Sequence, residues 1–238
     1  MKILGIDTAT ECCSVALAPG DGHDIDEIQH ITPNGHSRMV LGMVRELLNK
    51  HHLNLTDLDA LSVDIGPGSF TGLRIGIGVV QGLAYAAGVH TVGLSSLHAL
   101  AGRCPDGLSV PAIDARMKQV YWGVFENRGG EPRKLAGPFV TAPEQIENMF
   151  SEVVKAEYLT RLNREDSILA VGNGWDHYSC QLPSSVGARA IRVIEKSFPL
   201  ASQIVRLALR ADQAAFRSPL ELTAAYVRNN VADRPGEG

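Results

Sequence analysis

The sequence is poor in the residues that build metal sites and disulfides. It has four cysteines in 238 residues, and the adjacent Cys12 and Cys13 would point to opposite faces of a strand, so they cannot readily pair with each other. No Cys-x-x-Cys motif is present, and no two of the eight histidines stand three or four residues apart. We therefore expect reduced, structural thiols and no metal site.

Long apolar runs and an excess of positive charge are missing as well. Nowhere do 18 apolar residues follow one another, and the chain opens with Lys2 and a short apolar run that ends at Asp7 rather than with a leader, so we expect a cytoplasmic protein with no membrane association. Residues 1–100 hold five Lys/Arg against ten Asp/Glu, and residues 101–238 hold seventeen against sixteen. Because affinity for a polyanion comes mainly from counterions displaced around Lys and Arg, the chain is expected to hold RNA poorly on its own.

The apolar residues, 45% of the chain, are enough for one large core or two modest ones. In the first hundred residues their spacing predicts strands over 2–6, 12–18, 25–32, 60–65 and 90–94, and helices over 37–51, 71–87 and 95–103. Three strands followed by a helix are the opening of an actin-type lobe.

A loop-forming segment at 102–107 divides the chain, and the pattern of its beginning returns afterwards. Ile6-Asp7-Thr8-Ala9 and the strand that follows are echoed 107 residues later by Ile113-Asp114-Ala115-Arg116 and a second strand. The echo predicts a duplicated lobe; the alternative is a chance match, since Ile-Asp is common. We expect a two-lobed α/β fold with an N-terminal lobe at 1–105 and a smaller C-terminal lobe at 106–238.

The second half continues with predicted strands over 135–140, 168–171 and 190–194 and helices over 143–150 and 200–216, and Gly172-Asn173-Gly174 is expected to open a further helix. The end of the chain, about 200–230, is a candidate for packing back on the first lobe. The polar tail from Tyr226 onward is rich in turn formers and is expected to be loose.

Asp7, Thr8 and Thr10 occupy the tight turn between the first two strands. Actin-type ATPases present a carboxylate and hydroxyls to nucleotide phosphates from such a turn. The alternative is a hairpin whose side chains bond its own backbone, and the lack of a second Gly-rich loop in the other lobe favours that alternative.

The segment from Gly66 to Gly76 is the most distinctive of the chain: a strand end, a turn and a helix whose free amides, with Gly66, Gly68 and Ser69 around them, could attract an anion. It is not a P-loop, because the Gly-Lys-Ser/Thr ending is missing. The dinucleotide reading fails too, because Thr71 stands where that fingerprint needs a third glycine.

The helix over 71–87 contains Gly76, Gly78 and Gly82, each costing about 1 kcal/mol relative to alanine. Close approach of another backbone would offset this cost, and the apolar stripe of the helix over 37–51 lies beside it in the prediction. We interpret both helices as a subunit interface; burial within one chain is the alternative. The predicted interface residues are Met39, Val40, Met43, Val44, Leu47, Leu73, Arg74, Gly76, Gly78, Val79 and Gly82.

His36 before Ser37 could pair a base with a nucleophile, but Ser37 is better interpreted as the N-cap of its helix. Asp114 and Arg116 are expected to form an exposed ion pair of little energetic value, with each other or with Lys118 and Glu126.

Several of these segments together resemble the bacterial TsaB (YeaZ) family: Ile6-Asp7-Thr8-Ala9-Thr10, His36-Ser37, the eleven residues from Gly66 to Gly76, Ile113-Asp114-Ala115-Arg116 and Tyr121. The resemblance runs from Met1 to about Phe125 and continues more weakly through Gly172-Asn173-Gly174 and Ala225-Tyr226-Val227-Arg228. It implies a two-lobed actin/sugar-kinase-like fold, a duplicated ribonuclease H-like lobe.

The resemblance also implies a function. Family members are non-catalytic partners of TsaD in the complex that transfers threonylcarbamoyl from threonylcarbamoyl-adenylate to N6 of the adenosine beside the tRNA anticodon. TsaD carries a metal-binding His-x-x-x-His, which this chain lacks, and TsaE supplies an ATPase. The resemblance further implies a homodimer in isolation through a surface overlapping that for TsaD, tRNA contact only through the complex, and no cofactor of this chain's own, with ATP or ADP bound at the complex.

Two enzymatic functions compete with this interpretation, a glycoprotease-like peptidase and a small-molecule kinase of the same fold. A peptidase needs a metal pair or an activated nucleophile with its base, and a kinase needs phosphate loops from both lobes and a positioned carboxylate. The sequence shows neither set.

Overall fold

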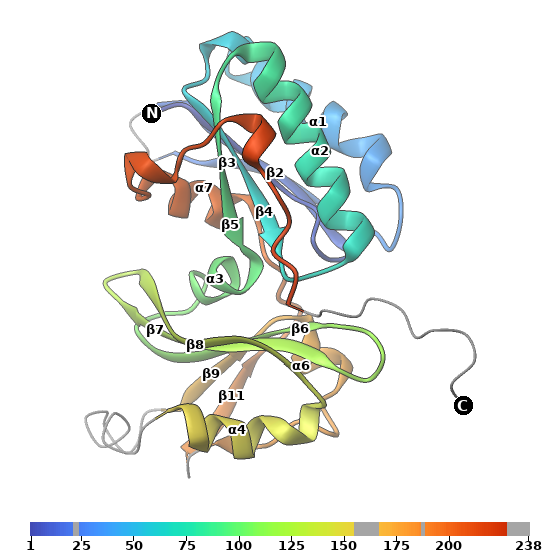
Figure 1. The fold of residues 1–238 in the computed structure, drawn as a ribbon, viewed down its shortest axis with the longest axis vertical. Coiled ribbons are helices and arrows are strands. Elements are labelled where there is room, and N and C mark those ends of the chain that lie inside the picture. The colour runs from blue at the N-terminus through green and yellow to red at the C-terminus, as the bar shows by residue number, and fades with distance from the viewer. Residues whose placement is uncertain (21–23, 155–166, 187–188, 228–238) are drawn as a thin grey trace.

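The computed structural model describes residues 1–20, 24–154, 167–186 and 189–227, which form two α/β lobes stacked one above the other (Figure 1). The first lobe is built on a five-stranded sheet with the strand order β3-β2-β1-β4-β5. Its strands are β1 (Ile3–Asp7), β2 (Cys12–Ala18), β3 (Asp26–Ile31), β4 (Ala60–Gly66) and β5 (His90–Ser95). The first three strands are antiparallel neighbours, whereas β4 runs parallel to β1 and β5 parallel to β4.

Helices cover both faces of this sheet. α1 (His36–Lys50) and α2 (Phe70–Ala87) lie on one face, and α7 (Ala201–Leu209) lies on the other. Because successive strand residues point to opposite faces, Leu4 and Ile6 pack toward α1 and α2 while Ile3 packs toward α7. All residues of β1 and β2 are consequently buried, which explains why both strands are so apolar.

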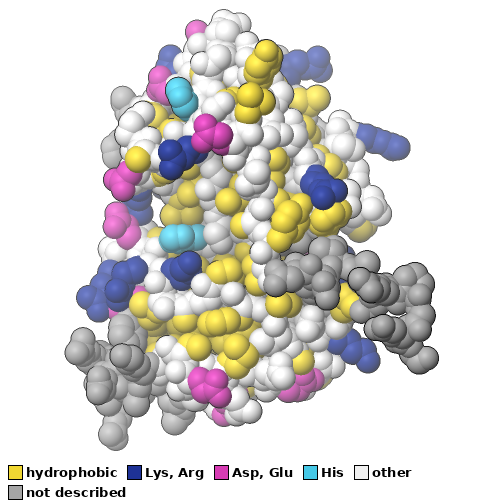
Figure 2. Space-filling view, viewed as in Figure 1, with side chains coloured by type: hydrophobic (Ala, Val, Ile, Leu, Met, Phe, Trp, Pro, Cys, Tyr) yellow, Lys and Arg dark blue, Asp and Glu magenta, His cyan; other side chains and the backbone are white. Residues whose placement is uncertain are grey.

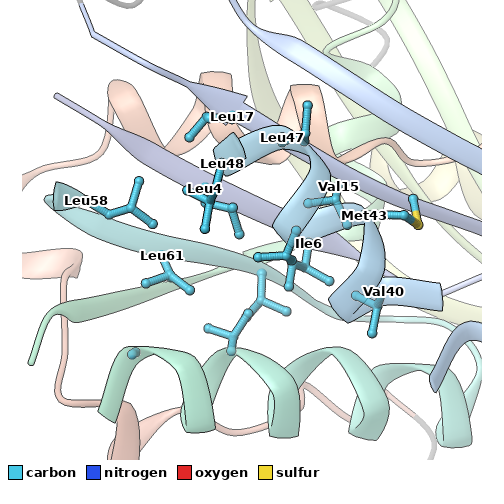
Figure 3. Close-up of a cluster of buried hydrophobic side chains, with 14 of the residues drawn as sticks. Leu4, Ile6, Val15, Leu17, Val40, Met43, Leu47, Leu48, Leu58 and Leu61 are labelled. Carbon is cyan, nitrogen blue, oxygen red and sulfur yellow. The ribbon is translucent and has the colours of Figure 1, made fainter. Parts of the chain in front are cut away.

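The apolar stripe of α1 belongs to the core of this lobe. Figure 3 shows Val40, Met43, Leu47 and Leu48 of this stripe in one cluster with the strand residues Leu4, Ile6, Val15 and Leu17. The predicted interface residues Val40, Met43, Val44 and Leu47 are each at most 4% exposed. The prediction that they contact a partner is therefore wrong, because the lobe's own sheet buries them. Burial of each large apolar side chain stabilises the fold by about 1.5–3 kcal/mol.

The second lobe repeats the strand order of the first. Its sheet has the order β10-β11-β9-β6-β7-β8, formed by β6 (Gly107–Asp114), β7 (Val120–Arg128), β8 (Glu131–Thr141), β9 (Ile168–Val171), β10 (Ser185–Val186) and β11 (Arg189–Ile194). β8, β7 and β6 are antiparallel neighbours, and β9 and β11 continue in parallel, as β3-β2-β1-β4-β5 do. α4 (Ile146–Val153) follows β8 and α6 (Asn173–His177) follows β9, matching α1 and α2. The predicted duplicated, actin/sugar-kinase-like fold is confirmed.

The end of the described chain returns to the first lobe. α7 packs on β1 and β2, and beyond it Arg217 exchanges backbone hydrogen bonds with Thr91 of β5 (both 2.8 Å). The predicted helix over 200–216 is too long, because α7 ends at Leu209 and the chain must then extend to reach β5. Most of the predicted loose tail, residues 228–238, lies outside the described residues.

A shared core joins the lobes. α3 (Ser96–Ala101) follows β5, yet its Leu97 and Leu100 pack with Phe125 and Leu169 of the second lobe. In Figure 1, α3 lies between the two sheets. Side chains of the two lobes therefore pack together around α3.

α2 is long and apolar enough to cross a membrane by length and composition alone. Core helices pass the same test, and Leu73, Ile77, Val80 and Ala84 of α2 are buried within the lobe. The helix therefore has a packing reason for its apolar character.

Candidate functional site

The predicted anion site begins at the turn between β1 and β2, where Asp7, Thr8 and Thr10 are all buried. Asp7 Oδ1 accepts a hydrogen bond from the Ala9 amide (2.9 Å), and Thr10 Oγ1 accepts one from the Cys12 amide (3.3 Å). Both bonds go to the turn's own backbone. The geometry favours the self-bonded hairpin over a phosphate-binding turn.

The glycine segment docks on this turn by close backbone contact. The Ser69 amide donates to the Ala9 carbonyl (2.7 Å), and Thr8 Oγ1 donates to the Gly72 carbonyl (2.7 Å). A Cβ at Gly68 would lie 2.5 Å from the Ala9 carbonyl oxygen, and one at Gly72 would lie 2.1 Å from that of Thr8. Glycine is required at both positions because no side chain fits at such distances.

Ser69 caps α2, since its Oγ accepts a hydrogen bond from the Gly72 amide (3.2 Å). The cap uses one of the amides that would otherwise be free to bind an anion. The structure brings together all six residues of the predicted site: Asp7, Thr8, Thr10, Gly66, Gly68 and Ser69. Their hydrogen bonds described here all go to the β1–β2 turn, to the end of β4 or to the start of α2.

Asp64, a residue not among the predicted site residues, stands beside Asp7. β1 and β4 are parallel with Ile6 opposite Val63, so Asp7 and Asp64 follow as the next neighbours on adjacent strands. Asp64 Oδ1 accepts hydrogen bonds from Ser96 Oγ (2.6 Å) and the Gly66 amide (2.7 Å). A charged residue inside the apolar run 60–65 was the signal that could have revealed it.

Burial dominates the electrostatics of this pair. Desolvation, followed by the negative charge of Asp64, raises the pKa of Asp7 well above its usual value. Desolvation likewise raises the pKa of Asp64 to about 6, against the lowering effects of the neighbouring Asp7 side chain and of the hydrogen bonds from Ser96 and Gly66. The same burial, with the charge of Asp7, raises the pKa of Cys12 to about 12 and that of Cys13 to about 11, so both thiols stay protonated. These thiols are buried and structural, as predicted for them.

A hollow of about 40 Å³ lies at the junction of the lobes, with room for a few water molecules. Its lining comes from the start of α2, from β7 and from the end of the described chain: Pro67, Gly68, Phe70, Leu73, Tyr121, Ala225, Tyr226 and Val227. The guanidinium of Arg74 lies 3.7 Å from the centre of the Phe70 ring and its Nε donates to Tyr226 Oη (3.4 Å).

The turns of the two lobes are tied together beside this hollow. Asn173, the first residue of α6, donates from Nδ2 to Glu11 of the β1–β2 turn (2.9 Å) and accepts from the Asp114 amide (3.2 Å). A Cβ at Gly172 would lie 2.1 Å from the Ala112 carbonyl oxygen, so α6 docks on β6 as closely as α2 docks on the first turn.

Neither catalytic alternative finds its parts among the described residues. No group of three or more His, Cys, Asp or Glu within them could hold a metal ion. His36 is 7% exposed and burial lowers its pKa, while Ser37 is exposed. Ser37 is not the N-cap either, because Gly35 in a left-handed conformation (φ 106°) starts α1 one residue earlier than predicted.

The outward side of α2 is an exposed face with two glycines at its centre. We define this α2 outer face as Arg74, Gly78, Gly82 and Tyr85, spaced three or four residues apart and all exposed. A Cβ at Gly78 or Gly82 would meet no atom within 4 Å. Both glycines therefore face open space.

The remaining predicted interface residues divide by burial. Leu73 is 2% exposed, and a Cβ at Gly76 would lie 2.5 Å from Thr8 Oγ1, so both face inward and their assignment to a partner surface is wrong. Arg74, Gly78 and Gly82 lie outward, with Val79 and Met39 partly buried. Tyr85 (75% exposed) and Leu41 (52%) are large exposed side chains of α2 and α1 that were not among the predicted interface residues.

Basic side chains gather beside the β7–β8 hairpin, at the left edge of the face shown in Figure 2. Arg128 and Arg133 are mostly exposed but both pair with the buried carboxylate of Glu126 (2.6 and 2.7 Å). Glu126 therefore cancels part of the positive charge in this cluster.

Comparison with known proteins places the chain. Residues 30–234 match the family model described as TsaD, tRNA N6-adenosine threonylcarbamoyltransferase. The chain is 35% identical over 237 residues to the Escherichia coli protein named tRNA threonylcarbamoyladenosine biosynthesis protein TsaB, covering 98% of this chain and 96% of that one. The Haemophilus influenzae protein of the same name is 32% identical, with coverages of 97% and 95%.

A solved structure agrees with these sequence matches. YeaZ from Pseudomonas aeruginosa superimposes with a TM-score of 0.80 at 31% identity, covering 94% of this chain and 99% of that chain. The similarity thus extends over both lobes and includes the segments on which the resemblance was first noted. On sequence and on structure, the chain belongs to the TsaB (YeaZ) family.

Proposed function

We propose that this chain is the non-catalytic partner subunit of a TsaD-containing complex that transfers threonylcarbamoyl from threonylcarbamoyl-adenylate to N6 of the adenosine beside the tRNA anticodon. The observation that carries the proposal is the α2 outer face, a helix surface on which two exposed glycines face open space. The apolar stripe of α1, the neighbouring helix, is buried in the core of the lobe. Relatives that match along nearly the whole chain are named for threonylcarbamoyladenosine biosynthesis.

The site chemistry supports a non-catalytic role. A kinase needs an ionised carboxylate and phosphate loops that reach a nucleotide, whereas Asp7 is fully buried and its turn is bonded to its own backbone. A peptidase needs an activated nucleophile or a metal. His36, the histidine considered above as a base for Ser37, is buried, and its Nε2 has no hydrogen-bond partner among the described residues. This chain then requires no cofactor itself, and ATP or ADP binds at the assembled complex.

The α2 outer face is the proposed contact surface for TsaD. Small residues let two helices approach closely, and Arg74 and Tyr85 at its ends are the residue types enriched at interfaces. The same surface would serve a homodimer when the chain is alone, so the two assemblies compete. TsaE joins through the complex, and tRNA reaches this cytoplasmic protein only there, since the chain carries 22 Lys/Arg against 26 Asp/Glu.

Replacing Gly78 with leucine tests the surface. The Gly78→Leu side chain enters open space, so the fold should persist, but it stands where the partner helix must approach. We expect co-elution with TsaD on size-exclusion chromatography to be lost, with an unchanged far-UV circular dichroism spectrum. Asn148→Leu adds the same side chain at an exposed position of α4 in the other lobe and should leave co-elution intact. If Gly78→Leu still co-elutes like wild type, TsaD binds elsewhere.

A further inference from the structure

Two buried carboxyl groups at the centre of the first lobe each have an oxygen without a hydrogen-bond partner. Asp7 ends β1 at 0% exposure, and Asp64 lies near the end of β4 at 1%. Their Oδ1 atoms are occupied by the Ala9 amide on one side and by Gly66 and Ser96 on the other. Both Oδ2 atoms are buried and unpartnered, and the parallel register of β1 and β4 places the two residues side by side.

Two ionised carboxylates in this position would be costly. Each would be stripped of water, and the like charges would repel at short range. The charged groups that act on Asp7 are Asp64 and, from β3, Glu27, and both are acidic. The thiols that Asp7 influences, Cys12 and Cys13 of β2, are neutral, and α3 contributes the hydroxyl of Ser96 to Asp64. Arg103 acts on Cys12 and Glu27, and Arg206 of α7 acts on Glu27. Neither arginine is among the main influences on Asp7 or Asp64.

A proton satisfies both oxygens at once. A carboxylic acid on Asp7 donates to the carboxylate of Asp64, which then accepts three hydrogen bonds, from Asp7, Ser96 and the Gly66 amide. Carboxylate pairs that share one proton in this way titrate as a unit.

We propose that Asp7 and Asp64 share one proton and form a latch that holds the β1–β2 turn against the Gly66–Ser69 loop. On one side of the latch, Asp7 Oδ1 accepts from the Ala9 amide, and the Ala9 carbonyl in turn accepts from the Ser69 amide. On the other side, Asp64 accepts from the Gly66 amide. It therefore fixes the start of α2, the helix that carries the α2 outer face. In this state Asp7 is a neutral hydrogen-bond donor, so the turn presents no free carboxylate to a ligand.

The sign of the pH dependence follows from the raised pKa of Asp7. A carboxyl whose pKa is raised by folding contributes stability at low pH that is lost as pH rises from its unfolded value toward its folded value. In Asp7→Asn the amide donates permanently to Asp64, with no proton to hold. We expect the urea midpoint of Asp7→Asn, relative to wild type, to increase steadily between pH 4 and pH 8.

Three measurements decide the proposal. Asp7→Ala, which leaves Asp64 without the donor, should have a lower urea midpoint than Asp7→Asn at every pH. The infrared spectrum of the wild type at neutral pH should show the C=O band of a buried carboxylic acid, and the spectrum of Asp7→Asn should lack it. Asp64→Asn, whose amide can donate to Asp7, serves in the same comparison if Asp7→Asn does not fold. A midpoint difference that stays constant with pH, or a wild type with no carboxylic acid band, would overturn the shared proton.

Discussion

Asp7 and Asp114 occupy equivalent places in the two lobes, each at the end of the first strand of its sheet, yet their surroundings differ. Asp7 is fully buried beside a second carboxyl group. The Asp114 side chain is 8% exposed, and it accepts hydrogen bonds from Tyr178 Oη (2.9 Å) and from the Arg116 amide of its own turn (2.8 Å). It also pairs with the exposed Arg116 guanidinium (3.3 Å), so its turn reaches the surface through that arginine. A duplicated strand-turn-strand unit has thus become an internal latch in one lobe and a surface turn in the other.

The helices that follow the fourth strand of each sheet repeat one docking contact. Gly72 of α2 meets the first turn of its lobe, and Gly172 before α6 meets the end of β6, both at distances that exclude a side chain. α2 is 18 residues long and carries the exposed Gly78 and Gly82, whereas α6 has five residues. The comparison suggests that the first lobe kept the docking and extended the helix into a contact surface.

The largest expected effect separates the inner and outer sides of α2. Gly72→Ala forces a Cβ to 2.1 Å from the Thr8 carbonyl oxygen and should cost about 3 kcal/mol of unfolding free energy. Gly78→Ala, the matched change on the outer face, meets open space and should raise the unfolding free energy by about 1 kcal/mol, because alanine favours the helix. Urea unfolding of both variants measures this. Similar losses in both would show that Gly78 also packs inside the chain.

The smallest expected effect concerns the surface turn. Arg116→Ala removes an ion pair whose arginine side chain is 83% exposed, so the unfolding free energy should change by less than about 0.5 kcal/mol. Thermal unfolding at low and high salt would check this, with little difference expected between wild type and variant in either. A loss above 1 kcal/mol would mean that the second turn is held as firmly as the first, and the contrast between the lobes would fail.

Most of the strands and helices were predictable because their signals are local. Alternation gave β2, and three- and four-residue spacing gave α1 and α2. The end of α7 was missed because the chain leaves the helix to pair Arg217 with Thr91, a contact between residues 126 positions apart. Tertiary pairing set that boundary, and periodicity could not.

The candidate site was less predictable, for the same reason. Asp64 matters because β4 runs parallel to β1 in a register that places it beside Asp7, and a single sequence does not reveal strand register. An apolar stripe likewise does not say what covers it, so Met43 and Leu47 of α1 were assigned to a partner although their own sheet buries them. Gly78 and Gly82 were correctly singled out as costly in a helix, and their exposure came only from the fold.

The central claim, that this chain acts through its α2 outer face in tRNA threonylcarbamoyladenosine formation, is tested most directly by the modified nucleoside itself. Threonylcarbamoyl-adenosine in bulk tRNA would be measured by mass spectrometry of nucleosides after depletion of the protein from its host and re-expression of variants. We predict a fall on depletion that wild type and Asn148→Leu restore and Gly78→Leu does not. An unchanged level under verified depletion, or full restoration by Gly78→Leu, would contradict the account.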